Sequence, residues 1–186
     1  MASFVRWLMR AVGVVALLSL VACTGSKPST HSSTGPTPSL HAPSASPTDP
    51  RLAAVQDALT AYRNMWQAYI AASNAGDPHS PDLAKYASGS ALTTLVTGLT
   101  NNKSKGLTTK GSPQLNPAQT GFSPADGPTS VTVGDCLDDS HWLLYKPNGD
   151  LADNTPGGRH RVTATVVKGD GGWKVTAFAA RGVGTC

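Results

Sequence analysis

The sequence predicts an α+β domain, in which N-terminal helices pack on one face of a curved antiparallel sheet. Apolar residues recur at steps of three and four over residues 50–73, which is the period of an amphipathic helix. After Gly106 the apolar period changes to two, which is the period of half-buried strands. All 11 acidic residues are Asp, and 19 Gly and 14 Pro are poor helix formers, so the composition disfavours an all-helical protein. Helices followed by a run of strands favour the α+β class.

Three helices are expected before the strands. The long helix is expected to begin with Asp49 as its N-cap and Pro50 at its first helical position. The segment 74–78 is expected to end it. Its apolar stripe consists of Leu52, Val55, Leu59, Tyr62, Trp66, Tyr69 and Ile70. A short helix follows from residues 80–82 to about 87. A third helix carries Leu92, Leu95, Val96 and Leu99 and ends in the polar stretch 101–106.

The second half of the domain reads as a meander of strands. Strands are predicted over 129–137, 141–146, 161–168 and 173–179, with Gly134 as a bulge. The Gly-Asp-Gly-Gly sequence at 169–172 predicts a tight hairpin between the last two. The segment 107–124 contains Pro113, Pro117 and Pro124, so we expect an edge strand or a loop there.

The N-terminal 22 residues have the features of an export signal. Arg6 and Arg10 precede an apolar run over 11–22, about 12 residues long and short of the roughly 20 needed to span a bilayer. The run ends in Leu20-Val21-Ala22-Cys23, which resembles the bacterial lipobox. The resemblance implies that 1–22 is a lipoprotein signal peptide and that Cys23 carries a diacylglyceryl group, which anchors the chain on the extracytoplasmic face of the cell membrane. An uncleaved anchor, or a plain secretory signal with a chance cysteine, is the alternative.

Residues 23–49 form the lipidated cysteine and a predicted disordered tether. Of the 26 residues in 24–49, 19 are Ser, Thr, Pro or Gly, and Leu40 is the only large aliphatic one. Such a segment cannot bury enough apolar surface to offset its ordering entropy. The predicted organisation is therefore signal peptide 1–22, tether 23–49 and folded domain 50–186.

The two remaining cysteines predict one disulfide. In an exported domain, Cys136 and Cys186 read as a structural pair that closes a loop of about 50 residues. A metal-binding or catalytic thiol is the alternative. Neither cysteine has the Cys-His spacing of a metal site or a neighbouring histidine that would activate it.

The order of elements resembles the NTF2-like (SnoaL-like, cystatin-like) cone, and in particular small secreted actinobacterial lipoproteins with that domain. The resemblance spans 50–186, and its most specific part is the closing pattern of the strand at 161–167 followed by Gly172-Trp173-Lys174-Val175. It implies a pocket between the long helix and the sheet. In the steroid-isomerase branch, an Asp base and a Tyr/acid oxyanion pair point into that pocket. No motif here matches that arrangement, so no catalytic residue is carried over.

Five aromatic residues are candidates for lining such a pocket, with an ordinary core role as the alternative: Tyr62, Trp66, Tyr69, Trp142 and Trp173. The other candidates are polar residues that could act as a base or hold a cation. The alternative for each is an ordinary structural role in a turn, a cap or a surface loop, where such residues are more typical. They are Asp135, Asp138, Asp139, His79, Asn148, Asp150, Asp153 and Asn154. His160, between two arginines, is a candidate anion ligand.

Several functions are excluded by what the sequence lacks. From residue 51 onward, 12 Lys and Arg face 10 Asp without runs of one sign, so no basic stripe for nucleic acid is present. No metal spacing, phosphate-binding glycine loop or cofactor motif is visible. We therefore expect a non-catalytic module that binds a protein, a wall polymer or a small apolar ligand. The alternative is an enzyme of the isomerase/dehydratase kind, which an open pocket with an Asp or His facing a Tyr or Trp would favour.

Overall fold

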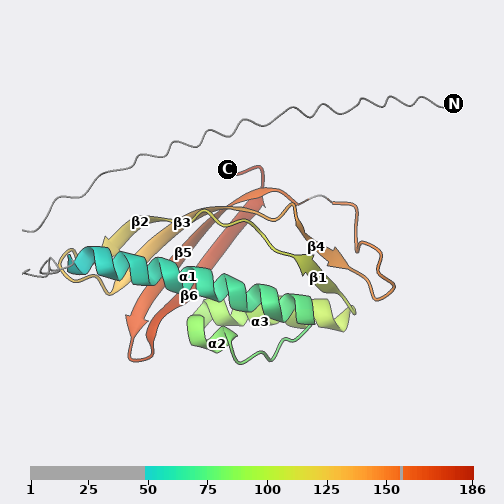
Figure 1. The fold of residues 1–186 in the computed structure, drawn as a ribbon, viewed down its shortest axis with the longest axis horizontal. Helices are drawn as coiled ribbons and strands as arrows, with labels where there is room; N and C mark the ends of the chain where they lie inside the picture. The colour runs from blue at the N-terminus through green and yellow to red at the C-terminus, as the bar shows by residue number, and fades with distance from the viewer. Residues whose placement is uncertain (1–48, 156) are drawn as a thin grey trace, which may run out of the picture. The chain divides into compact units, whose positions relative to one another are not determined.

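The computed structural model describes residues 49–155 and 157–186. The predicted signal peptide, Cys23 and the tether up to residue 48 lie outside the described residues. The elements along the chain are α1 (Pro50–Ala75), α2 (Leu83–Tyr86), α3 (Gly89–Ser104), β1 (Thr108–Gly111), β2 (Ala118–Ser123), β3 (Ser130–Asp138), β4 (Trp142–Tyr145), β5 (Arg159–Gly169) and β6 (Gly172–Val183) (Figure 1). Helices packed on antiparallel strands confirm the predicted α+β class.

Capping interactions define both ends of the long helix α1. The Asp49 side chain accepts a hydrogen bond of 2.9 Å from the backbone N–H of Arg51, and Pro50 occupies the first turn. At the other end Gly76, with φ of 64°, donates its N–H to the carbonyls of Ala72 and Ser73. The helix runs two residues beyond the predicted end at 73, because the left-handed Gly76 closes it.

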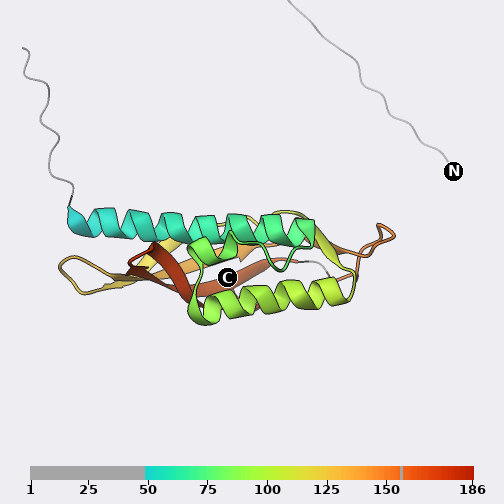
Figure 2. The same cartoon turned by 90° about the horizontal axis from the view of Figure 1, so that it is seen from below.

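The long helix α1 packs across both sheets, whereas α2 and α3 pack at the β6 edge. Contacts of α1 reach β1, β2, β3, β5 and β6, whereas α3 packs mainly on β6. Figure 2 shows α1 and α3 running alongside each other, with the short α2 between them. Among the described residues, no helix is long and apolar enough to cross a membrane.

The main sheet has four antiparallel strands in the order β2-β3-β5-β6. The predicted strand over 141–146 is present as β4, but it is not part of this meander. Asp138 at the end of β3 pairs with Arg159 at the start of β5, so the two strands are direct neighbours and the chain between them loops outward. Within that loop β4 pairs instead with β1, from Thr108 opposite Tyr145 to Gly111 opposite Trp142. The segment 107–124, for which an edge strand or a loop was expected, contains β1 and the edge strand β2.

Bulges in the edge strands curve the sheet. The bulge predicted at Gly134 is wrong for β3, which pairs with β5 without a break. The extra residue lies opposite, in β2 between Gln119 and Gly121. Gly134 accommodates it, because a Cβ at this position would lie 2.9 Å from Cγ2 of Thr120. On the other edge, β6 shifts register against β5 twice.

The core lies between α1 and the inner face of the sheet. Residues of β3 alternate strictly, with Val131, Val133, Asp135 and Leu137 buried. Across from them, the largest fully buried side chains of α1 are Tyr62 and Met65. One polar residue, Asp135, therefore occupies a core position on the inner face of the main sheet.

Candidate functional site

The interior contains a buried tyrosine–carboxylate pair. The Tyr62 hydroxyl donates a hydrogen bond of 2.9 Å to Oδ2 of Asp135, and the backbone N–H of Asn116 donates one of 2.7 Å to Oδ1. Tyr62 is 0% exposed and Asp135 is 5% exposed. Burial and the neighbouring carboxylate raise the pKa of the Tyr62 hydroxyl well above its ordinary value. Both side chains are buried, although Asp135 also belongs to the lining of a small depression of ≈ 270 Å³ beside Cys136 and Cys186.

An aromatic cluster fills the space beside this pair. Trp66 is its centre, with ring centroids 5.9 Å from Tyr69, 6.3 Å from Trp142 and 6.2 Å from Phe178. All these contacts are edge-to-face, the geometry that aromatic quadrupoles favour. Side chains therefore occupy the region between α1 and the sheet in which the NTF2-like resemblance implies a pocket.

The structure thus divides the five aromatic candidates. Tyr62, Trp66, Tyr69 and Trp142 belong to one edge-to-face network. Trp173 does not take part in these pairs, and its buried ring lies near the helix residues Ala61 and Asn64 at a separate shallow depression. Of the five, Trp142 also contributes to the wall of a larger pocket on the surface, described next.

This surface pocket has a volume of ≈ 580 Å³ and lies at the end of the sheet where β4 and its following loop meet the start of β5 and the end of β6. We call it the β4–β5 pocket. It is lined by Asp139, Ser140, Trp142, Leu143, Leu144, Leu151, Asp153, Asn154, Thr155, Gly157, His160 and Val183. Its volume is in the range of roughly 300–1,000 Å³ that is typical of small-molecule sites.

The polar end of the pocket is built around Asp139 and His160. Oδ1 of Asp139 accepts a hydrogen bond of 2.7 Å from the backbone N–H of Gly158. Nε2 of His160 lies 3.2 Å from Oδ2 of Asp139, although the two atoms do not form a hydrogen bond. Nδ1 of His160 is 2.8 Å from the carbonyl oxygen of Arg181 and must donate to it, because a carbonyl only accepts. Nε2 is buried, and the Asp139 side chain is more exposed than that of His160, 28% against 17%.

The apolar part of the pocket is unusually open to water. Four large hydrophobic residues are exposed in the described part of the chain, and two of them, Leu151 at 42% and Val183 at 56%, line this pocket. Exposed apolar surface that is rimmed by polar groups is typical of a binding site. Trp142 adds an aromatic surface next to it.

The remaining candidates lie in separate places. Asp135 is in the interior of β3 and is not a turn residue, whereas Asp138 ends β3 and accepts the backbone N–H of Ser140 at 3.0 Å. The side chain of Ser140 and then its backbone N–H hold the pKa of the Asp138 carboxyl below its ordinary value. Asn148 and Asp150 hydrogen-bond each other within the turn after β4, at 2.8 Å.

His79, a candidate for which a surface role was the alternative, lies in the connection between α1 and α2. Asp77 accepts the backbone N–H of His79, in an exposed loop. Within residues 49–155 and 157–186, no three His, Cys, Asp or Glu side chains are grouped so that they could share a metal ion.

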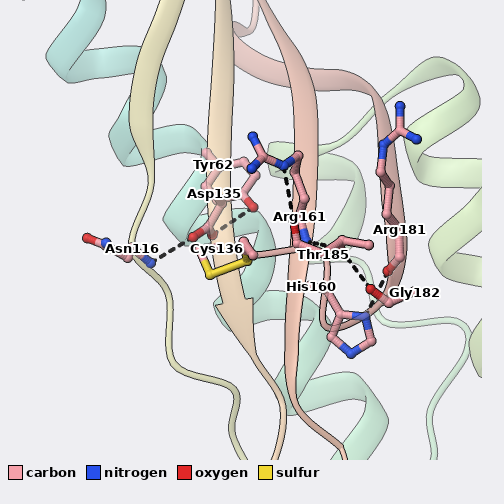
Figure 3. Close-up of a disulfide and its surroundings, with 10 residues drawn as sticks. Tyr62, Asn116, Asp135, Cys136, His160, Arg161, Arg181, Gly182 and Thr185 are labelled. Carbon is pink, nitrogen blue, oxygen red and sulfur yellow. Dashed lines mark hydrogen bonds between the residues drawn. A yellow bond between two sulfur atoms is a disulfide. The ribbon is translucent and has the colours of Figure 1, made fainter.

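A disulfide joins Cys136 to Cys186, as the sequence predicts, with Cα atoms 5.9 Å apart (Figure 3). Cys136 is opposite Arg161 in the pairing of β3 with β5, so the C-terminal residues must cross β5 to reach it. The backbone N–H of Arg161 donates to Oγ1 of Thr185 at 2.9 Å, and its side-chain Nε donates to the carbonyl of Thr185 at 3.3 Å. The crossing segment follows directly after Val183, so the disulfide fixes one wall of the β4–β5 pocket.

Comparisons with known proteins indicate the fold and no more. No protein-family model matches the chain, and no curated protein sequence is similar to it. The intermembrane space region of the chloroplast protein ARC6 has a similar structure, with a TM-score of 0.52 and 14% identity over 69% of this chain and 96% of that one. A putative aromatic ring hydroxylase from Novosphingobium aromaticivorans gives a TM-score of 0.48 and 15% identity over 69% of this chain and 90% of that one. At such identities the similarity is one of fold.

Proposed function

We propose that this chain is a lipoprotein anchored through Cys23 to the extracytoplasmic face of the cell membrane, and that its domain is a non-catalytic module that binds a small ligand in the β4–β5 pocket. The observation that carries the proposal is the contrast between the two candidate sites. The interior that would serve an enzyme is closed over Tyr62 and Asp135, whereas the surface pocket is open and partly apolar. Among the expected ligand classes, a pocket of ≈ 580 Å³ favours a small molecule over a wall polymer or a protein.

Anchoring and binding are tested separately. For the anchor, Cys23→Ala should abolish incorporation of a labelled fatty acid and move the chain from the membrane fraction to the medium or to an unprocessed form. Ser26→Ala, three residues away, is the matched control and should be processed like the wild type. If Cys23→Ala is still lipidated and retained, the anchor proposal is wrong.

For the binding module, ligand-observed NMR with a set of apolar fragments compares the wild type with Val183→Asp. Val183 is 56% exposed and lines the pocket, so a carboxylate there should cost little stability but should disfavour apolar ligands. Leu52→Asp changes another exposed apolar residue, 62% exposed and outside the pocket, and should leave binding intact. Fragments that bind both variants equally would place the binding surface elsewhere and contradict the proposal.

One observation favours the enzyme alternative. Asp139 and His160 meet at an open pocket beside Trp142, which is the combination of groups that an acid–base enzyme would need. However, the imidazole has Nδ1 engaged by the Arg181 carbonyl and Nε2 buried, so neither nitrogen is free to exchange a proton with a substrate, and Asp139 is the more exposed side chain of the two. A lone carboxylate in an accessible pocket suits binding better than a two-group proton transfer. Turnover of a ketosteroid or hydroxy-acid substrate that is lost in Asp139→Asn would favour the enzyme.

A further inference from the structure

We infer that the ligand of the β4–β5 pocket carries a protonated amine on an apolar body. The inference deepens the proposed function, because it assumes that this pocket is the binding site. It depends on three features of the pocket: the sign of its charge, the way in which Asp139 is held, and the apolar surface beside that carboxylate.

The lining of the pocket is acidic. Two carboxylates, Asp139 and Asp153, belong to it, the other ionisable lining residue is His160, and no Lys or Arg lines it. Their potential repels an anion and attracts a cation, and a neutral apolar ligand would desolvate the Asp139 carboxylate without replacing its contacts with water. An ammonium group satisfies the carboxylate instead, through a charge-assisted hydrogen bond.

Asp139 is held in place before any ligand arrives. Its Oδ1 accepts the Gly158 N–H at 2.7 Å, and this hydrogen bond orders the carboxylate, whereas Oδ2 lies 3.2 Å from His160 Nε2 without a hydrogen bond to it. Each carboxylate oxygen has two lone pairs, so acceptor capacity remains for a ligand. The 28% exposed side chain provides the route to it. Because the rotamer is already ordered, a ligand loses less free energy to ordering on binding.

Glycines allow the loop before β5 to close tightly on this site. A Cβ on Gly157 would lie 2.6 Å from the carbonyl oxygen of Asp139, and a Cβ on Gly158 would lie 2.7 Å from Cγ1 of Val183. Only residues without side chains fit between these groups. The loop thereby brings the carboxylate and the apolar wall into one pocket.

The apolar wall of the pocket favours an apolar body for the part of the ligand that does not contact Asp139. Leu151 and Val183 together expose the apolar surface that a hydrocarbon chain or ring would cover, at about 25 cal/mol per Å² of surface removed from water. Trp142 lines the same pocket, while its ring packs edge-to-face against Trp66 and Tyr69. The expected ligand is thus a small amphipathic cation.

The test uses three eight-carbon probes that differ only in the head group: n-octylammonium, n-octanol and octanoate. Each is titrated into the full mature chain, and amide chemical shifts give the site and the affinity. We expect octylammonium to bind most tightly and octanoate least, with shifts at Leu151, Gly157 and Gly158. Asp139→Asn should weaken octylammonium by roughly tenfold or more, since a hydrogen bond to a charged group is lost, and should change octanol little. Asp170→Asn, in the β5–β6 turn, is the control and should have no effect.

The possible outcomes separate the ligand class from the pocket. Equal binding of octanol and octylammonium, or an unchanged octylammonium affinity in Asp139→Asn, overturns the ammonium inference and leaves the pocket as a binding site. Failure of all three probes to shift any pocket residue overturns the pocket as well. If Asp139→Asn loses its fold, as far-UV circular dichroism would show, Asp153→Asn repeats the test, because the structure gives Asp153 only a local bond from the Thr155 N–H.

Discussion

The hydroxyl of Tyr62 on α1 and the carboxylate of Asp135 on β3, 73 residues apart in sequence, meet in a hydrogen bond of 2.9 Å inside the core. The second oxygen of Asp135 accepts the Asn116 N–H, so the polar group that interrupts the apolar face of β3 is bonded at both oxygens. A buried carboxylate is tolerated only when it is satisfied in this way. The pair therefore fixes how α1 sits on the sheet, and it closes the interior.

Tyr62→Phe should destabilise the domain because it removes the donor and leaves Oδ2 of Asp135 buried without a partner. The expected loss of unfolding free energy is about 1–3 kcal/mol, measured by urea denaturation. Tyr86→Phe is the matched control, since Tyr86 is half-buried and its hydroxyl makes no hydrogen bond to any of the described residues. Equal stability of Tyr62→Phe and the wild type would show that the pair contributes nothing.

The same pair predicts an alkaline limit to stability. The pKa of Tyr62 is raised in the folded state by burial and by Asp135, and burial also raises that of Tyr69. Above the ordinary tyrosine pKa of 10.0 the unfolded chain loses these protons while the folded chain keeps them, so stability falls as the pH rises. For Tyr62 the slope is at most about 1.4 kcal/mol per pH unit. Denaturation midpoints at pH 9 to 11 should fall more steeply for the wild type than for Tyr62→Phe, and parallel slopes would contradict this.

Local signals predicted the elements whose causes are local. Asp49 and Pro50 mark the start of α1, and the alternation through Val131 and Val133 marks β3. The disulfide followed from the count of cysteines in a domain that the sequence predicts to be exported, without knowledge of the fold. Asp135 carried a signal as well, because it continues the buried alternation of β3, and the prediction that it is a turn residue is wrong.

Long-range pairing could not be predicted in this way. Nothing in the sequence of β4 distinguishes a partner in β1 from one in the main sheet, since both would bury the same apolar residues. Asp139 and His160 are 21 residues apart, and they meet only because Asp138 pairs with Arg159. The surface pocket depends on the pairing of β4 with β1 and on that of Asp138 with Arg159. Its residues could therefore be predicted only as separate candidates, without their partners.

The pairing of β1 with β4, which includes the pocket residue Trp142, should require glycine at position 111. This residue has φ of 86°, and a Cβ on it would collide with the backbone carbonyl of His141. Gly111→Ala should therefore separate β1 from β4 and displace Trp142. Gly149 has a similar φ of 89° but nothing within 4 Å, so Gly149→Ala reports the conformational cost alone, about 1–2 kcal/mol. We expect the Gly111 variant to lose clearly more stability than the control and to change Trp fluorescence; equal losses would contradict the steric argument.

The disulfide should stabilise both the domain and the β4–β5 pocket. It closes a loop with a sequence separation of 50, for which chain entropy gives up to about 4 kcal/mol, less if the unfolded chain is compact. Its removal also frees the segment that crosses β5 and so loosens Val183, whose neighbour Gly184 donates its N–H to the Arg159 carbonyl at 2.8 Å.

The double variant Cys136→Ser/Cys186→Ser tests this without leaving a free thiol. Urea denaturation should show the loss of stability, and amide hydrogen exchange should show faster exchange at Gly184 and Val183 than in β3. Thr185→Val is the control for the crossing segment, because it keeps the disulfide but removes the hydroxyl that bonds the Arg161 N–H at 2.9 Å, and it should cost only about 1 kcal/mol. If the double variant were as stable as the wild type and exchanged no faster at Val183, the disulfide would not support the pocket wall.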